Sequence, residues 1–69
     1  MKLSARNVLQ GTIKSIKEGP ISTLVTIEVA PNVEIVSVIT SEGVDSIKLE
    51  VGQSAYAVIK ASNVMVGVE

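Results

Sequence analysis

The chain contains no cysteine, no histidine, no phenylalanine and no tryptophan among its 69 residues. Without thiol or imidazole groups, disulfide frameworks, metal sites built from those ligands, and Ser-His or Cys-His catalysis are excluded. Tyr56 is the one aromatic residue and the net charge is −1, whereas single-stranded nucleic acids bind to aromatic residues in a basic groove. A nucleic-acid-binding domain is therefore a disfavoured alternative.

The sequence also lacks a long hydrophobic run. No apolar stretch approaches the ~20 residues that a membrane-spanning helix needs, and residues 1–4 are not followed by the apolar region of a secretory signal. The absence of cysteine is compatible with a reducing compartment. We therefore expect a cytoplasmic protein with no membrane partner.

The abundant residues are the β-branched ones. Valine contributes 12 residues, isoleucine 8 and threonine 4, together 24 of 69. Branching at Cβ restricts χ1 and suits the pleated surface of a sheet. Because a chain of this length buries only about 60% of its unfolded surface, a hydrophobic content of 46% leaves apolar area exposed on a monomer. The composition predicts a strand-rich protein that self-associates.

Glycine and proline residues divide the chain into short segments. The pattern predicts one or two helical turns after a cap at Thr40 or Ser41, and strands over residues 9–17, 21–30, 33–40, 54–60 and 64–68. This is the element order of an all-β protein, a small five-stranded OB-type Greek-key barrel with one short helix between strands three and four. We expect residues 1–69 to form a single domain.

The third expected strand, residues 33–40, is apolar on both faces. Ile35 and Ile39 alternate with Val36 and Val38, so the two pairs point to opposite sides of a sheet. Two apolar faces on one strand indicate burial on both sides. In so small a domain, a neighbouring subunit is the simplest cover for the second face.

Two cationic residues are candidates for binding an anion. Arg6 precedes the first strand and Lys60 closes the fourth, and both are flanked by hydroxyl side chains and irregular backbone. A guanidinium, an ammonium and orientable hydroxyls would together suit a small tetrahedral oxyanion. The alternative is that both are ordinary solvated charges, paired with Glu18 or Glu69.

The acidic residues offer a second candidate site. Glu28 and Glu34 flank the turn at residues 31–32 and could act as an acid and base pair, although solvated strand residues are the alternative that we prefer. We expect Tyr56 and Met65 to be packing residues. With no activated nucleophile in the sequence, we expect a protein that is not an enzyme.

The chain resembles the molbindins, a family of small molybdate-binding proteins, in its opening segment Ser4-Ala5-Arg6-Asn7-Val8-Leu9-Gln10-Gly11. The same fold recurs as the transport-associated OB domain of regulators and transporter ATPases. Further matches, which extend the resemblance over residues 2–68, are Val38-Ile39-Thr40, Leu49-Glu50-Val51-Gly52 and Lys60-Ala61-Ser62-Asn63-Val64-Met65.

The resemblance implies a molybdate site in a cleft between subunits. It implies that one subunit supplies the Ser4 hydroxyl, Arg6 and neighbouring backbone. Another subunit would supply Thr40, Lys60 and the Ala61 N–H. No metal cation and no organic cofactor is implied, because molybdenum arrives as the anion.

Four further positions are less certain members of this site. Asn7 and Ser62 adjoin the implied ligands. Gly43 stands where the family often has a second hydroxyl, three residues after the threonine, so one hydrogen bond is missing or comes from the backbone or from Ser41.

The resemblance also implies an assembly and a role. The assembly is a hexamer built as a trimer of dimers, with additional anion sites near its threefold axis for which residues 20–23 are a candidate. The role is intracellular molybdenum storage or homeostasis, with tungstate barely distinguishable from molybdate. The alternative is a structural or regulatory oligomerisation module whose anion binding is weak or lost.

Overall fold

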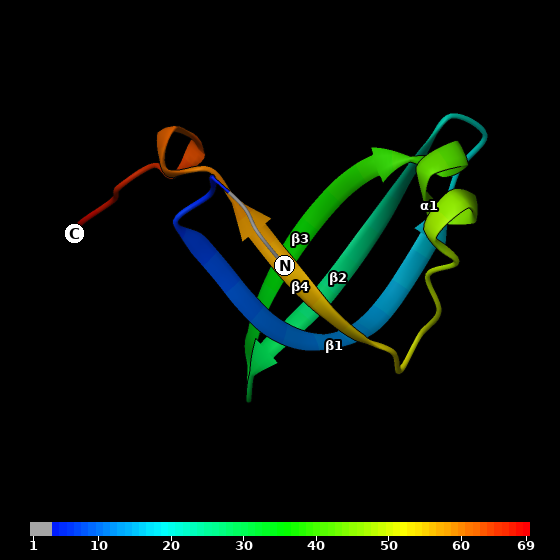
Figure 1. Cartoon of the computed structure of the whole chain (residues 1–69). Coiled ribbons are helices and arrows are strands. Elements are labelled where there is room, and N and C mark those ends of the chain that lie inside the picture. The colour runs from blue at the N-terminus through cyan, green and yellow to red at the C-terminus, as the bar shows by residue number, and fades with distance from the viewer. Residues whose placement is uncertain (1–3) are drawn as a thin grey trace.

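A computed structural model describes residues 4–69 of the chain (Figure 1). Residues 1–3, with which the expected domain begins, lie outside this range. The elements in chain order are β1 (Asn7–Glu18), β2 (Ser22–Ala30), β3 (Val33–Thr40), α1 (Ser41–Ile47), β4 (Ser54–Ile59) and the 3₁₀ turn η1 (Ala61–Asn63).

The four strands form one antiparallel sheet in the order β3-β2-β1-β4. The long strand β1 bends sharply and carries β2 on one edge and β4 on the other, so the sheet curls into a half-barrel (Figure 1). The register between β1 and β2 shifts between Ile13 and Ser15, and such an irregularity increases local twist. Because the strand order is β3-β2-β1-β4, β3 and β4 are the two free edges of the sheet.

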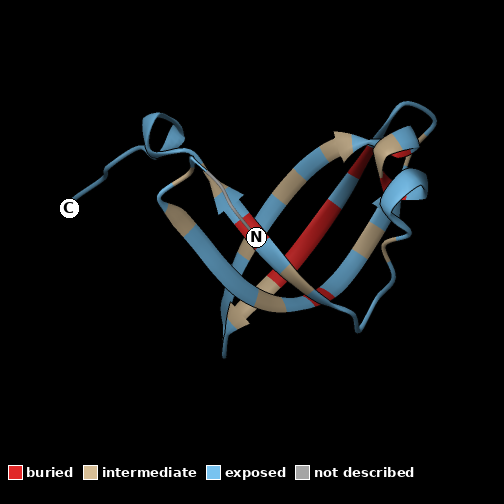
Figure 2. Cartoon of the chain, viewed as in Figure 1, coloured by how far each residue is buried: buried red, intermediate tan, exposed pale blue. Residues whose placement is uncertain are grey.

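The buried residues lie on β1, β2 and β4 of the half-barrel and in α1 (Figure 2). Ile13, at 1% exposure, is the most deeply buried member of the hydrophobic core and packs with Val25, Ile27 and Ala57. The partly buried hydrophobic residues around this cluster are Ile16, Val29, Ile35, Ile39, Leu49 and Ala55. One layer of aliphatic side chains thus holds the single chain together.

The third strand has two different faces, as its pattern predicts. Ile35 and Ile39 pack against the core, whereas Val36 and Val38 are 58% and 65% exposed. Nothing within residues 4–69 covers the second face. The apolar side chains of this face are exposed, and their burial against a neighbouring subunit stays a prediction.

The expectation of five strands is wrong for the single chain, because residues 64–68 form no strand within residues 4–69. After β4, η1 turns the backbone with bonds from the Asn63 N–H to the Lys60 carbonyl oxygen and from the Val64 N–H to the Ala61 carbonyl oxygen. The segment that follows runs away from the sheet (Figure 1). A strand needs a paired edge as well as β-branched residues, and η1 carries this segment away from both free edges.

The expected helix forms and begins where its cap was predicted. The Thr40 hydroxyl oxygen accepts a hydrogen bond of 3.0 Å from the Gly43 N–H, which satisfies one of the unpaired donors of the first turn. Lys48 ends α1 in the left-handed region, at φ 53°.

Within residues 4–69, α1 is far too short to cross a membrane and no other helix reaches the length and hydropathy that crossing demands.

Candidate functional site

Arg6 and Lys60 are brought together by the pairing of β1 with β4. Asn7 and Ile59 are opposite each other in this antiparallel ladder, and the Asn7 side-chain amide donates to the Ile59 carbonyl oxygen at 3.2 Å. Arg6 and Lys60 are the next residue outward on each strand. We call this place, with the adjoining Ser4, Ala61 and Ser62, the cationic end.

The cationic end is open to solvent. Arg6 and Lys60 are exposed, and the ion pairs recorded for residues 4–69 do not include them. The alternative pairing with Glu18 or Glu69 therefore does not form in this chain.

The backbone at the cationic end adds a donor. Lys60 precedes η1 with extended backbone and no side chain caps the turn. The first N–H groups of a helical turn have no partner inside it, so the Ala61 N–H is a candidate donor to a ligand. Ser4 and Ser62, each two residues from Arg6 or Lys60 in the sequence, are exposed hydroxyl residues.

Thr40 and Gly43 lie at the junction of β3 and α1, which we call the threonine end. A threonine hydroxyl has one hydrogen and two lone pairs. Since Thr40 Oγ1 accepts from the Gly43 N–H, its hydrogen stays available to a ligand. A Cβ atom at position 43 would lie 3.0 Å from Thr40 Oγ1, so the missing side chain leaves this oxygen uncrowded.

Ser41 differs from its neighbour Thr40 because it is buried. Its Oγ atom lies 2.6 Å from the Gly19 carbonyl oxygen and 2.7 Å from the Thr23 hydroxyl oxygen. Thr23 belongs to β2 and is fully buried, with 0% exposure. The sequence analysis included Thr23 only within residues 20–23, as a candidate for anion sites near a threefold axis, and did not foresee its hydrogen bond to Ser41.

The cationic end and the threonine end lie at opposite ends of the half-barrel (Figure 1). The resemblance grouped Thr40 with Lys60 on one subunit, but the fold places Lys60 beside Arg6 instead. The reason is the antiparallel pairing, which joins the end of β4 to the start of β1, whereas Thr40 is opposite Ser22 near the far end of β1. No single copy can therefore present both ends to one small anion.

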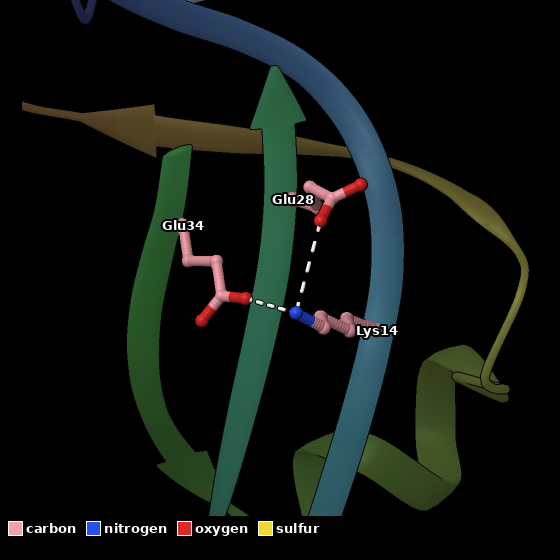
Figure 3. A network of polar contacts seen from close by, with 3 residues as sticks. All are labelled: Lys14, Glu28 and Glu34. Carbon is pink, nitrogen blue, oxygen red and sulfur yellow. Dashed lines mark hydrogen bonds and ion pairs between the residues drawn. The ribbon is translucent and has the colours of Figure 1, made fainter. Parts of the chain in front are cut away.

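Glu28 and Glu34 are directly opposite each other in the β2–β3 ladder. The Lys14 ammonium lies between them, hydrogen-bonded to Glu34 and 3.8 Å from a Glu28 oxygen (Figure 3). The hydrogen bond and charge of Glu34 raise the pKa of Lys14 above its usual 10.5. These carboxylates are exposed or half-buried ion-pairing residues, and no cluster suited to a metal ion occurs among residues 4–69.

An apolar groove follows the opening between the free edges of β3 and β4. Hydrophobic side chains from the two strands dominate its lining, with Ser37 and Tyr56 as the polar members; the other lining residues are Ile27, Ile35, Val36, Ala57, Val58 and Ile59. We call it the edge groove. In a closed five-stranded barrel, a further strand would occupy this position.

The fold and these two ends define a small curved sheet that gathers cationic and hydroxyl donors at separate points. The family model described as the TOBE domain matches residues 3–66. The chain belongs to the TOBE domain family, as its resemblance to the transport-associated OB domain indicated.

Relatives of known name cover the whole chain. A probable molybdenum-pterin-binding protein of Haemophilus influenzae is 45% identical over 69 residues, which is 100% of both chains. The structure of a molybdate-binding protein from Sporomusa ovata matches 99% of this chain and 100% of its own, with 31% identity and a TM-score of 0.91. The cytoplasmic molybdate-binding protein ModG, solved with molybdate bound, matches 100% of this chain and 49% of its own, with 48% identity and a TM-score of 0.93.

Proposed function

We propose that this protein binds molybdate, with tungstate as a near-equivalent, and serves in intracellular molybdenum storage or homeostasis without catalysing a reaction. The observation that carries the proposal is the position of Arg6 and Lys60, each next to the Asn7–Ile59 pair that ends the β1–β4 ladder, on a fold that matches molybdate-bound ModG at 48% identity. The description of ModG as cytoplasmic supports the same location for this chain.

The chemistry of the donors suits an oxyanion. Arg6 and Lys60 would neutralise a dianion charge for charge, and charge-assisted hydrogen bonds are the strong ones in proteins. The Ser4 hydroxyl and the Ala61 N–H add neutral donors at the cationic end, and Thr40 of another copy adds a third. Asn7 and Ser62 adjoin this set.

We propose a hexamer, built as a trimer of dimers, as the binding form. Since the cationic end and the threonine end are separated in one chain, a site that uses both needs two copies. The exposed Val36 and Val38 on the outer face of β3 offer an apolar surface for the same assembly.

Within this proposed assembly, two copies would join as a dimer at the edge groove. Residues 64–68 carry the β-branched pattern of a strand but leave their own sheet (Figure 1). The edges of β3 and β4 meanwhile lack a partner strand within residues 4–69. Two copies that exchange these segments would each gain the fifth strand, because an unpaired edge is a template for another chain.

The experiment that tests the function is isothermal titration of molybdate into the protein, with sulfate present in the cell, alongside a native mass measurement. We expect tight binding that survives sulfate, in a particle of about 43 kDa for six copies of the 7.2 kDa chain. A silent titration from an intact oligomer would instead favour an oligomerisation module that has lost anion binding.

The Arg6→Ala substitution tests whether the cationic end is the molybdate site. Each charge-assisted hydrogen bond that it removes contributes about 1.5–3 kcal/mol, so molybdate affinity should fall at least about tenfold. Lys14→Ala is the matched control, because it removes one exposed positive charge from the middle of β1, between the cationic end and the threonine end. An Arg6→Ala hexamer that binds as tightly as the Lys14→Ala protein would contradict the assignment.

A further inference from the structure

Three groups form a hydrogen-bonded chain beside the threonine end, in which Thr23 and Ser41 are buried and Gly19 is half-buried. The Ser41 hydroxyl donates to the Gly19 carbonyl oxygen at 2.6 Å, and the Ser41 and Thr23 hydroxyl oxygens are 2.7 Å apart. A serine has one hydroxyl hydrogen, and Gly19 takes it. The Thr23 hydroxyl must therefore be the donor to Ser41, so the chain of hydrogen bonds runs from Thr23 through Ser41 to Gly19.

This direction decides what Ser41 can do. Its hydrogen is committed to Gly19 and its side chain is buried, so it has no donor left for an anion. The hydroxyl that remains available at the junction is that of Thr40, one residue earlier. Ser41 and Thr40 thus have different tasks although the sequence presents them as equivalent hydroxyl residues.

The hydrogen-bonded chain fastens the start of α1 to the β1–β2 turn. The Ser41 N–H donates to the Ile21 carbonyl oxygen at 2.8 Å, while its side chain binds Gly19 in the same turn. Thr23, on β2, donates a hydrogen bond to the Ser41 hydroxyl and so links the start of α1 to this strand as well. The peptide that links Thr40 to Ser41 is therefore held through both the backbone and the side chain of Ser41.

We propose that Thr23 and Ser41 are positioning residues that fix where the Thr40 hydroxyl points, and that they thereby set the affinity and selectivity of the anion site. This inference rests on the proposed function. Consecutive hydrogen bonds polarise one another in a low-dielectric interior, so the buried chain resists rotation of the first turn of α1. The accuracy of a binding site depends on such supporting groups.

The test compares Thr23→Val, which removes the donor at nearly constant shape, with Thr23→Ser, which keeps it. Ser41→Ala removes the central hydroxyl and serves as a second probe if Thr23→Val does not fold. Ile13→Val is the control for general destabilisation, because this change in the core typically costs about 0.5–1.5 kcal/mol and Ile13 is outside both the hydrogen-bonded chain and the edge groove. Each oligomer is titrated with molybdate and with sulfate well below its unfolding temperature.

We expect Thr23→Val and Ser41→Ala to weaken molybdate binding about tenfold, the loss of roughly one charge-assisted hydrogen bond, and to lower the ratio of molybdate to sulfate affinity. Thr23→Ser and Ile13→Val should stay near the parent protein in both measurements. Unchanged affinity and selectivity in both hydroxyl deletions, or an equal loss in Ile13→Val, would overturn the positioning role. A parent protein that binds no molybdate would instead overturn the proposed function itself.

Discussion

Residues 64–68 give the sharpest test of how copies of this chain associate. Val64, Val66 and Val68 alternate with Met65 and Gly67, so a strand formed there has a valine face and a Met-Gly face. In the single chain, Val66 is 91% exposed. If the segment fills the edge groove of a second copy, its valine face turns toward the apolar lining and Met65 turns outward.

The expected magnitude follows from the burial that Val66 would gain. Fully burying a valine side chain contributes about 1.5–3 kcal/mol, and a reciprocal exchange between two copies contains two such side chains. Val66→Asp removes both contributions, about 3–6 kcal/mol in all, and also forces two carboxylates out of water. Association within the dimer should therefore weaken by at least about 100-fold.

The assay is sedimentation or light scattering over a dilution series, with circular dichroism as a check on the fold. We expect Val66→Asp to dissociate at concentrations where the parent oligomer is intact, and Met65→Asp to stay assembled. Equal dissociation of the two variants would refute the two-faced strand. A Val66→Asp protein with the parent mass at every concentration would refute the exchange.

Two further substitutions test the sheet itself. Lys14→Met should lower the free energy of unfolding at about pH 8, because Glu28 and Glu34 then lie opposite each other with no positive charge between them. The pKa of Lys14 is raised above 10.5 in the folded protein. The stabilisation by Lys14 is therefore fully present below pH 10.5 and is lost as the pH rises through the raised pKa. Urea midpoints of both proteins, measured at about pH 8 and at a series of pH values above about 10.5, check this, and a difference that does not shrink as the pH rises through the series would contradict it. Ile13→Ala should cost about 2–5 kcal/mol in the free energy of unfolding, since Ile13 is the deepest residue of the core; a urea titration that shows less than about 1 kcal/mol would mean that this site collapses or is not central.

Local chemistry accounts for the elements that the sequence predicted. β3 has the expected limits, residues 33–40, because a turn precedes it and a helix cap ends it. That cap is Thr40, whose hydroxyl binds the first turn of α1 as predicted. Strand and helix signals of this kind act over three or four residues, so one sequence is enough to read them.

Contacts between segments far apart in the chain could not be predicted from the sequence. Residue chemistry supplied Arg6 and Lys60 as candidates and the resemblance added Thr40, but their grouping depends on which strands pair. The pairing of β1 with β4 joins residues that are 42 to 52 positions apart, from Thr12 with Ser54 to Asn7 with Ile59, and nothing in the local pattern predicts it. The alignment of Lys14 between Glu28 and Glu34 likewise arises from two ladders at once.

The sequence alone determined that this protein is an aliphatic, β-rich chain with one capped helix and few sites for chemistry, because composition, periodicity and caps are local properties. Only the tertiary structure decided that Ser41 is buried with Thr23 while Thr40 stays exposed, and that residues 64–68 leave the sheet. Those outcomes depend on which surfaces meet, and burial and pairing are properties of the assembled fold.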